Sequence, residues 1–269
     1  MGQIKQQALT FYFEITVINT TIIRCTMFDD HFEVFLADTH ESKEIHYSIR
    51  YQVYCEEMGF ENKDNFPRKQ EFDDHDHQSA HFIARHKRTG QWVGAMRLIF
   101  HNGQSLPIEQ YCTLQERIGT NDVKQSAELS RLCVVKEVRR GFVDIDPPNG
   151  IKDESEAIKE TYIVKSLHNR QNLNRSIIWG LLNAATEFCY SNNIDNWYFI
   201  TTNALAKVLR KGGFNMLSIG EPCYHNGERY PFKKDVVETY HNETWRKNFK
   251  NGYRIFSESD LPEFIGVAA

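Results

Sequence analysis

The alternation of hydrophobic and polar residues divides the first part of the chain into a strand and a helix. Residues 31–38, HFEVFLAD, alternate with the period of two that is typical of a strand. In the segment that follows, residues 38–59, Ile45, Ile49 and Val53 recur every four residues. This spacing places them on one face and predicts an amphipathic helix.

The middle of the chain predicts a polar loop and three strands. Residues 60–80 are polar and acidic, as is typical of a loop. Residues 80–87 and 91–100 flank a Thr-Gly turn, which predicts an antiparallel hairpin. Residues 127–134, AELSRLCV, predict the next strand. Residues 141–171 contain two prolines and a weak pattern, so we expect an insert that is at most partly helical.

The second half of the chain predicts alternating helices and strands. Residues 173–190 keep apolar side chains at a spacing of 3.6 residues and form the strongest predicted helix. A strand at 196–201, a helix at 203–213 and a strand at 214–220 follow, and Asn-Gly at 226–227 favours a tight hairpin turn. This order predicts an α/β fold with a mixed central sheet flanked by helices, antiparallel early in the chain and parallel where the long helix crosses over.

Capping residues suggest where the two shorter helices begin and end. Asp38, with Glu41 three residues later, is suited to cap the first helix. Asn203 is suited to begin the later helix, and Gly212 or Gly213 to end it.

Composition and charge narrow the class of protein. The chain has 269 residues, 41% hydrophobic and 25% charged, which is typical of a globular protein with a sizeable core. A formal net charge of −4 argues against a protein built to coat nucleic acid. No uninterrupted apolar run reaches the roughly 18 to 20 residues needed to span a bilayer, and no signal peptide is expected.

We expect one decorated domain. The predicted organisation is an N-terminal extension at 1–28, a core at 29–235 that contains the insert at 141–171, and a C-terminal extension at 236–269.

The six cysteines are scattered and form no Cys-x-x-Cys pair. Their neighbours are mostly apolar, so we expect reduced core thiols rather than disulfides or zinc ligands, and a reducing cytoplasm as the compartment. They are Cys25, Cys55, Cys112, Cys133, Cys189 and Cys223.

The strand AELSRLCV is unusual because it contains charged residues at positions of a buried strand. In a regular strand Glu128 and Arg131 would face opposite sides of the sheet. A β-bulge would realign them, and bulges are common beside active sites. We therefore expect an irregularity at Leu129–Ser130; a buried ion pair or two strand-end charges is the structural alternative.

Three arginines lie in apolar periodic segments, where an unpaired charge is costly. They are Arg50, Arg97 and Arg131. Each needs a carboxylate partner, and the nearest in the pattern are Asp73, Asp76 and Glu128. A metal site of the same two aspartates with His75, His77 and His81 is a weaker hypothesis, because their spacing matches no familiar ligand set.

Several ordered motifs together resemble the autoinducer-synthase-like branch of the GCN5-related N-acyltransferases (GNAT). They are IRYQVYCEEMGFE, EFDDHD, GAMRL, ELSRLCV, LAKVLRKGGF and YHNGERYPF, between about residues 30 and 235. The most similar groups are the PEP-CTERM/exosortase-associated acyltransferases and the long-chain N-acyl amino acid synthases. The resemblance implies a GNAT fold and transfer of a medium or long acyl group from a thioester to an amine.

The same resemblance implies roles for individual residues. Glu128 corresponds to a general base, and backbone N–H groups near Leu132, Cys133 and Val134 to the contacts of the acyl donor. The positions that match the pocket and its ion-pair network in acyl-homoserine-lactone synthases are Arg50, Tyr54, Phe60, Asp73, Asp76, Arg97, Ser130 and Arg131. Phe60 stands where those synthases have Trp.

One departure from the family bears on the donor. The glycine-rich loop that holds the pyrophosphate of acyl-CoA is missing. We therefore expect an acyl-phosphopantetheine thioester on acyl carrier protein, with acyl-CoA as the alternative, and no bound cofactor or metal. Carrier docking is expected at Lys136, Arg139, Arg140, Lys207, Arg210 and Lys211, although a solvated basic face would look the same.

Three functions stay open. The first is an N-acyltransferase whose acceptor is the amine of an amino acid or related metabolite. The second is an acyl-homoserine-lactone synthase that uses S-adenosylmethionine. The third is a non-catalytic module that binds acyl chains or carrier protein.

Overall fold

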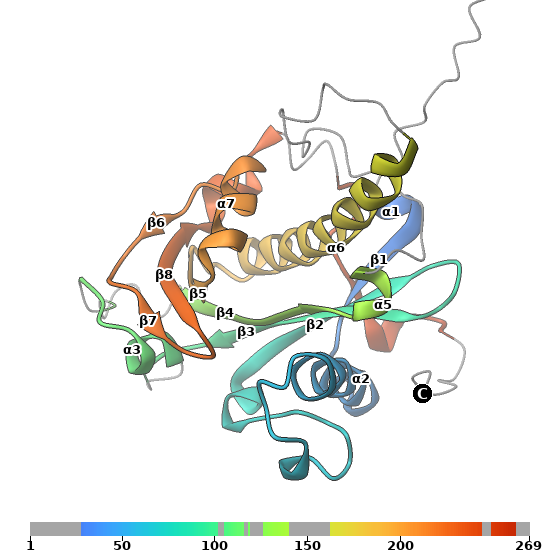
Figure 1. Ribbon diagram of the computed structural model, residues 1–269, viewed down its shortest axis with the longest axis horizontal. Coiled ribbons are helices and arrows are strands. Elements are labelled where there is room, and N and C mark those ends of the chain that lie inside the picture. Colours follow the sequence, from blue (N-terminus) through green and yellow to red (C-terminus); the bar gives the residue numbers. More distant parts are fainter. Residues whose placement is uncertain are drawn as a thin grey trace, which may run out of the picture.

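Figure 1 shows the computed structural model of the chain, which describes residues 28–101, 105–115, 118, 126–139, 162–243 and 249–261. For Arg139 and for residues 162–175 only the backbone is described. The predicted N-terminal extension, apart from Phe28, and residues 141–161 of the predicted insert lie outside this part of the chain.

The strands form one mixed sheet in the order β6-β8-β5-β4-β3-β2-β1-β9, with β7 paired to β8. β4 pairs with β5, and β1 with β9, in parallel; the remaining pairs are antiparallel. The predicted mixed sheet is thereby confirmed. The strands are β1 Phe32–Leu36, β2 Ser79–His86, β3 Trp92–Phe100, β4 Ser126–Val134, β5 Asn196–Thr201, β6 Leu217–Ser218, β7 Cys223–Tyr224, β8 Glu228–Asp235 and β9 Arg254–Ile255.

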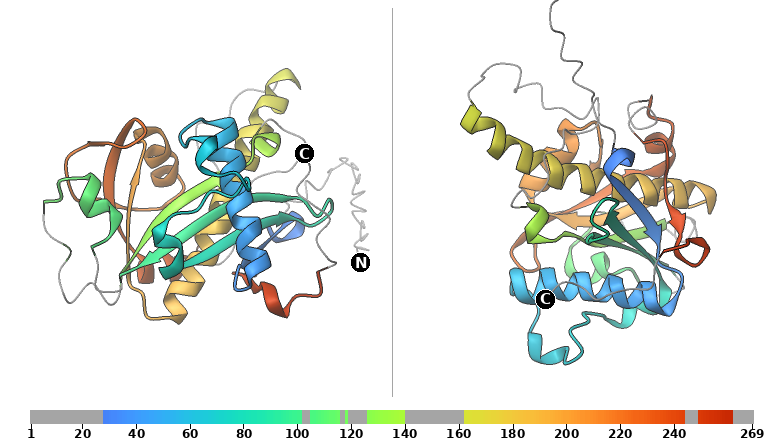
Figure 2. Two further views of the ribbon diagram at one scale, coloured as in Figure 1. Left: turned by 90° about the horizontal axis from the view of Figure 1, so that it is seen from below. Right: turned by 90° about the vertical axis from the view of Figure 1, so that its right-hand side faces the viewer.

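Helices cover both faces of this sheet. α2 lies against one face and α6 against the other, as the views in Figures 1 and 2 show. The helices are α1 Phe28–His31, α2 His40–Arg50, α3 Pro107–Tyr111, α5 Lys136–Arg139, α6 Tyr162–Ser191, α7 Asn203–Lys211 and α8 Val236–Tyr240, with a π-helical turn at Tyr51–Glu57. The core between α6 and the sheet is aliphatic and aromatic, and Trp179 and Trp197 are fully buried in it.

α2 begins one residue later than its predicted cap. Thr39, not Asp38, is the N-cap, and its side chain and that of Ser42 form a reciprocal capping box. The Asp38 carboxylate instead accepts hydrogen bonds from the backbone N–H and the hydroxyl of Ser257. The predicted cap was wrong because the C-terminal segment, 219 residues away, uses that carboxylate.

The later helix shows the same shift. Thr202 caps α7 by accepting from the backbone N–H of Leu205, and Asn203 is the first helical residue. Gly212 ends the helix, and Gly213 follows with a φ of +79°, a conformation that glycine adopts without steric cost.

Two predicted segments differ from the structure in extent. α6 begins at Tyr162, so the last ten residues of the predicted insert are helical; the polar residues 168–171 interrupt the apolar pattern between Leu167 and Leu173. In the predicted C-terminal extension, β9 pairs with β1, and Arg254 Nη1 lies 3.0 Å from Glu33 Oε2. That segment therefore completes an edge of the sheet.

The cysteine prediction was wrong for one pair. Cys112 and Cys223 form a disulfide that links the residue after α3 to β7. These residues are 111 positions apart, so no local spacing in the sequence indicates the pair. Cys55, Cys133 and Cys189 are free and buried, as predicted. The disulfide removes part of the argument for a reducing compartment.

None of the helices in the described ranges is both long and apolar enough to cross a membrane.

Candidate active site

β4 is irregular at Arg131, which forms ion pairs with the acidic loop before β2. Ala95 pairs with Cys133 and Arg97 with Ser130, so Met96 alone lies opposite the two residues Arg131 and Leu132. This is a β-bulge, and Arg131 has a φ of +52°, which is uncommon for a residue with a side chain. The bulge was predicted, but its predicted position was wrong.

The pairing register between β3 and β4 explains why the bulge lies after Ser130 and not at Leu129–Ser130. The ladder stays regular at Leu129 and Ser130, which pair with Leu98 and Arg97. The extra residue is accommodated where the Arg131 side chain turns toward Glu71. As a result Glu128 and Arg131 line one pocket, although a regular strand would place them on opposite faces.

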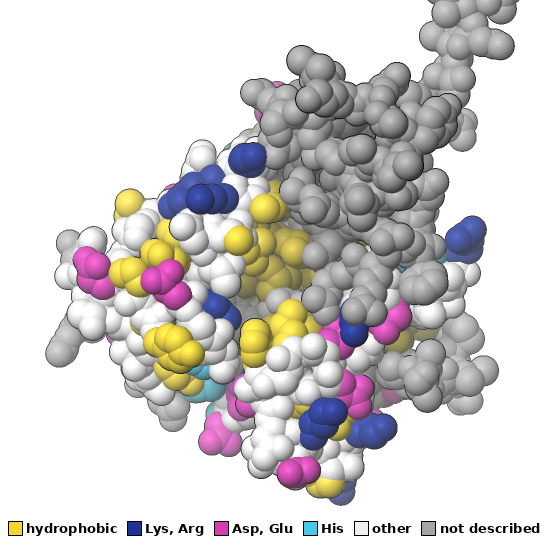
Figure 3. Space-filling model, in the orientation of Figure 1, with side chains coloured by type: hydrophobic (Ala, Val, Ile, Leu, Met, Phe, Trp, Pro, Cys, Tyr) yellow, Lys and Arg dark blue, Asp and Glu magenta, His cyan; other side chains and the backbone are white. Residues whose placement is uncertain are grey.

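The pocket opens where β4 and β5 separate. These strands pair only over Ser126–Glu128 and Asn196–Tyr198, and the residues just beyond, on both strands, line a cavity of about 440 Å³. Figure 3 shows a hollow with hydrophobic side chains in it. The charged part of the lining comes from β3, β4, residues 58–75 and the β7–β8 hairpin. The apolar part includes Leu129, Leu182, Leu205, Leu209 and Phe214.

Arg50 is fully buried on α2 and forms ion pairs with three carboxylates, of which Asp73 Oδ2 lies 3.9 Å from its Nη2. Its Nε donates to Glu71, and its Nη1 lies 2.6 Å from Asp76 Oδ1. The predicted need for a buried carboxylate partner is met, because the apolar face of α2 would otherwise hold an isolated charge.

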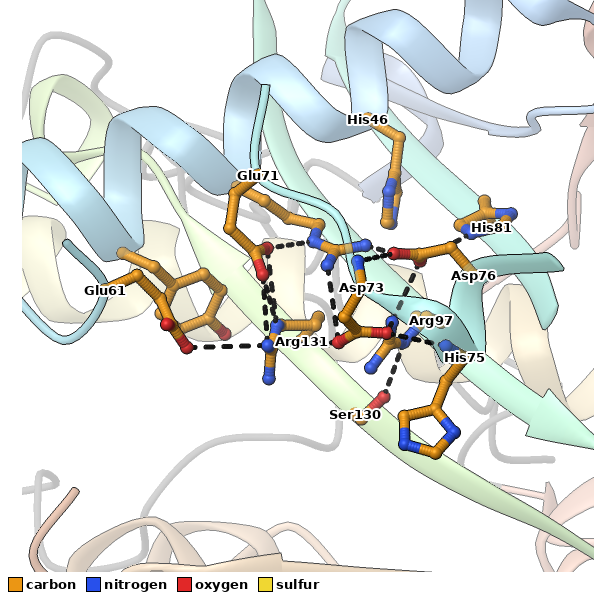
Figure 4. A network of polar contacts seen from close by, with 12 residues as sticks. His46, Glu61, Glu71, Asp73, His75, Asp76, His81, Arg97, Ser130 and Arg131 are labelled. Carbon is orange, nitrogen blue, oxygen red and sulfur yellow. Dashed lines mark hydrogen bonds and ion pairs between the residues drawn. The ribbon is translucent and has the colours of Figure 1, made fainter. Parts of the chain in front are cut away.

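Arg97 on β3 and Arg131 on β4 bind carboxylates that also pair with Arg50. Arg97 Nη1 lies 2.6 Å from Asp73 Oδ1 and 2.9 Å from Asp76 Oδ1, and its Nε donates to the Ser130 hydroxyl at 3.0 Å. Arg131 Nη2 lies 3.0 Å from Glu71 Oε1 and 3.2 Å from Asp73 Oδ2. Figure 4 shows the network.

Two members of the network were missed in the sequence. Glu71, 1% exposed, contacts both Arg50 and Arg131, and Glu61 Oε1 lies 3.5 Å from Arg131 Nη2. Both belong to the acidic loop but stand outside the Asp-x-x-Asp pattern. Glu128, which was expected to pair with an arginine, has no salt bridge to a described residue.

The network lowers the pKa values of three of its four carboxylates, Glu71, Asp73 and Asp76. Burial alone would raise the pKa of Asp76, but its hydrogen bond with His81 and the charges of Arg50 and Arg97 lower it far below the usual range. The arginines likewise lower the pKa values of Glu71 and Asp73 against the effect of burial.

Glu128 has the opposite electrostatics. Its side chain is buried, and Oε2 accepts a hydrogen bond of 2.7 Å from the backbone N–H of Ile108. Burial raises the pKa of this carboxyl to about 8, despite the lowering effects of the Ile108 N–H and of Arg97. A carboxyl that titrates near neutrality and lines a pocket is typical of an acid–base group.

Tyr54 and Phe60 lie beside Arg131. The Arg131 guanidinium lies 5.5 Å from the centre of the Tyr54 ring, and the Tyr54 hydroxyl donates to the Leu132 carbonyl at 3.2 Å. The rings of Tyr54 and Phe60 are stacked with centroids 6.5 Å apart, and both residues line the pocket.

The expected donor contacts begin in the bulge, at Leu132, and continue just after it. Leu132 lines the pocket, whereas Cys133 and Val134 are buried and pair with Ala95 and Gly94. Burial raises the pKa of the Cys133 thiol to about 12, which argues against a thiolate nucleophile.

The basic residues proposed for carrier docking fall into two groups. On α7, Lys207, Arg210 and Lys211 are exposed, and Figure 3 shows Lys and Arg side chains above the hollow. Lys136 is half-buried at the start of α5. The side chain of Arg139 and all of Arg140 lie outside the described residues.

The histidines of the acidic loop lie in different environments. His81 Nε2 lies 3.0 Å from Asp76 Oδ1, and His75 lines the pocket. Across the described ranges, no group of three or more His, Cys, Asp or Glu side chains is placed to hold a metal ion.

Residues 49–144 match the family model described as "Acetyltransferase (GNAT) domain". No curated protein matches the sequence. Among solved structures, the chain is similar to the CoA-dependent acyl-homoserine lactone synthase BjaI with SAM and isopentyl-CoA (15% identity, TM-score 0.54, 87% of this chain and 95% of that one). It is also similar to the synthase MesI (17%, 0.53, 84% and 98%) and to the AHL synthase LasI (14%, 0.51, 83% and 97%).

At these identities the solved structures show a shared fold. The predicted GNAT fold is therefore confirmed, and it is the fold of the autoinducer synthases named above; the matched domain marks the chain as an acyltransferase.

Proposed function

We propose that this GNAT-type acyltransferase moves a medium or long acyl group from a phosphopantetheine thioester to the amine of an amino acid or a related metabolite. The observation that carries the proposal is Glu128: a buried carboxyl with a pKa of about 8, in a pocket with one charged and one apolar part.

The apolar part suits an acyl chain. Leu182 comes from α6, Leu205 and Leu209 from α7, and Phe214 from the segment after it, so the lining continues into the core. A cavity of about 440 Å³ lies within the range of roughly 300 to 1,000 Å³ that is usual for small-molecule sites. Burial of the methylene groups would supply most of the binding free energy of the donor.

Glu128 supplies the proton chemistry. The amine nitrogen attacks the thioester carbon, the C–S bond breaks, and the amine must lose a proton as the amide forms. Ionised Glu128 takes this proton directly or through water, and the leaving thiolate then receives it, which returns Glu128 to its ionised form. Backbone N–H groups near Leu132 to Val134, beside the bulge, are the proposed donors to the developing oxyanion.

Acyl carrier protein is the proposed donor. Lys207, Arg210 and Lys211 are exposed on the helix that also supplies Leu205 and Leu209 to the pocket. An acidic carrier docked on these side chains would present its thioester near the cavity. The triple change to Glu should reduce transfer from acyl carrier protein at least tenfold and leave transfer from acyl-CoA unchanged; an equal loss with both donors would contradict carrier docking.

The product decides between this function and the second candidate. Acyl-homoserine-lactone synthesis is favoured by the fold shared with BjaI, whose structure contains SAM. It would release methylthioadenosine, because lactone closure displaces it from S-adenosylmethionine. Mass spectrometry of lipid extracts from expressing cells should show N-acyl amino acids and no acyl-homoserine lactones. Binding of the acyl donor without any N-acyl product would indicate a non-catalytic module.

A further inference from the structure

The β7–β8 hairpin brings a second cationic group to the pocket. Asn226 and Gly227 have φ values of +51° and +101°, so they form the predicted tight turn between Tyr224 and Glu228. His225, just before the turn, and Arg229, just after it, both line the pocket. They are half-buried.

Arg229 differs from the other arginines of the pocket. Arg97 and Arg131 form ion pairs with Asp73, whereas Arg229 has no carboxylate partner in the described ranges. Its Nη2 donates to the Asn226 carbonyl at 2.7 Å and its Nη1 to the Glu228 carbonyl at 3.1 Å. These neutral acceptors orient the guanidinium without neutralising it, and a guanidinium has five N–H donors.

The neighbourhood of His225 indicates the same excess of positive charge. Its ring lies 4.2 Å from the Tyr111 ring. Burial, and then the charges of Arg131 and Arg229, lower its pKa. Two nearby acids are engaged elsewhere: Glu228 accepts from the Tyr230 hydroxyl at 2.8 Å, and Glu109 from the Leu106 N–H at 2.9 Å.

Covalent and hydrogen-bond links fix this hairpin to the element that holds Glu128. The Cys112–Cys223 disulfide joins β7 to the end of α3, and the Gln115 N–H donates to the Ile219 carbonyl at 2.8 Å. The first turn of α3 supplies the Ile108 N–H to Glu128. The hairpin that carries Arg229 is therefore linked to the helix whose Ile108 N–H contacts Glu128.

We propose that Arg229, assisted by His225, binds the carboxylate of the acceptor while Glu128 receives the proton of its amine. This inference rests on the proposed function and deepens it, because it restricts acceptors to amines that carry a carboxylate. A carboxylate would form charge-assisted hydrogen bonds with the unneutralised guanidinium. A phosphate of the acyl donor is the other oxyanion that could bind there.

The test compares an amino acid with its carboxamide, which keeps the amine and the side chain. Wild-type protein should show a KM for the amino acid roughly 10- to 100-fold lower than for the amide, from the usual strength of a charged hydrogen bond. Arg229→Gln should raise the KM for the amino acid by about that factor and leave the amide unchanged, whereas Arg229→Lys should restore part of the loss. Arg254→Gln, on the edge strand β9, is the matched control.

Two results would overturn the inference. One is equal use of acid and amide with an equal effect of Arg229→Gln on both. The other is a change confined to the KM of the donor, which would assign the oxyanion to the donor phosphate. If neither acceptor is acylated, the proposed function fails instead, and calorimetric binding of the two acceptors to wild type and Arg229→Gln still tests the carboxylate site.

Discussion

Glu128→Gln separates the ionisation of this side chain from its hydrogen bond. Gln keeps an oxygen that can accept from the Ile108 N–H, so α3 should stay in place. Loss of a general base typically lowers kcat by about 10²- to 10⁴-fold. We expect a loss in this range with an unchanged KM for the acyl donor, because the acyl chain contacts the apolar lining instead.

The pH dependence of stability gives a second readout. The pKa of Glu128 is about 8 in the folded protein, against 4.5 for an unperturbed Glu, so the folded state holds a proton that the unfolded state loses between these values. The stabilisation from Glu128 is present below pH 4.5 and is lost as the pH rises through 8. The difference between a pKa of 4.5 and one of about 8 corresponds to at most about 5 kcal/mol, at about 1.4 kcal/mol for each tenfold change in the acid constant.

The variant lacks this proton, so its stability relative to wild type should increase between pH 5 and pH 9. Urea unfolding of both proteins at pH 5 and at pH 9 measures this change in relative stability. The carboxylates of Glu71, Asp73 and Asp76 have lowered pKa values, so their contribution is lost only in acid and leaves this window unaffected. Glu41→Gln, at an exposed position of α2, is the control.

Kinetics and stability together make the reasoning refutable. The kcat of wild type should rise with pH through about 8 as Glu128 ionises. In Glu128→Gln, only the pH dependence caused by deprotonation of the acceptor amine should remain. An unchanged kcat would remove Glu128 as the base. A stability difference that is equal at pH 5 and pH 9 would show that its pKa is not raised.

Three further predictions concern stability and chain length. Glu71→Gln should lower the free energy of unfolding by about 3 kcal/mol, because it breaks a buried ion pair with Arg50. Glu61→Gln should lower it by less than about 1 kcal/mol, because the Glu61 side chain is 31% exposed. Equal urea midpoints for the two variants would contradict this. A dithiol reductant should lower the stability of wild type by about 2 to 4 kcal/mol through the Cys112–Cys223 disulfide, and should not affect the Cys112→Ser/Cys223→Ser double variant; an equal effect on both proteins would exclude the disulfide as the cause. Leu182→Phe should fill part of the apolar lining and shift acyl preference to chains shorter by roughly two methylene groups, measured by competition between donors, and an unchanged preference would place the acyl chain elsewhere.

The local elements could be predicted from the sequence because hydrophobic periodicity reports which side of a strand or helix is buried. The strand at 31–38, the helix with Ile45, Ile49 and Val53, and the Asn226-Gly227 turn all occur where they were expected. The clustering of Arg50, Arg97 and Arg131 with aspartates was also predictable, because a buried guanidinium requires a carboxylate.

Contacts between distant segments depended on the tertiary structure. Asp38 lost its capping role to Ser257, Cys112 bonded to Cys223, and Glu71 joined Arg50 to Arg131; in each case the partner is separated by at least 20 residues. Periodicity contains no information about such partners, because it describes only how a segment faces a core.

The charged residues in AELSRLCV show most directly what the sequence determined and what the tertiary structure decided. Its sequence alone determined that a regular strand could not bring Glu128 and Arg131 to one pocket, since successive side chains alternate between faces. Only the register between β3 and β4 decided that the extra residue lies at Arg131–Leu132, and only the packing of α3 decided that Glu128 is buried against the Ile108 N–H with a raised pKa. Register and burial depend on what the neighbouring strands and helices present, so they are properties of the folded chain as a whole.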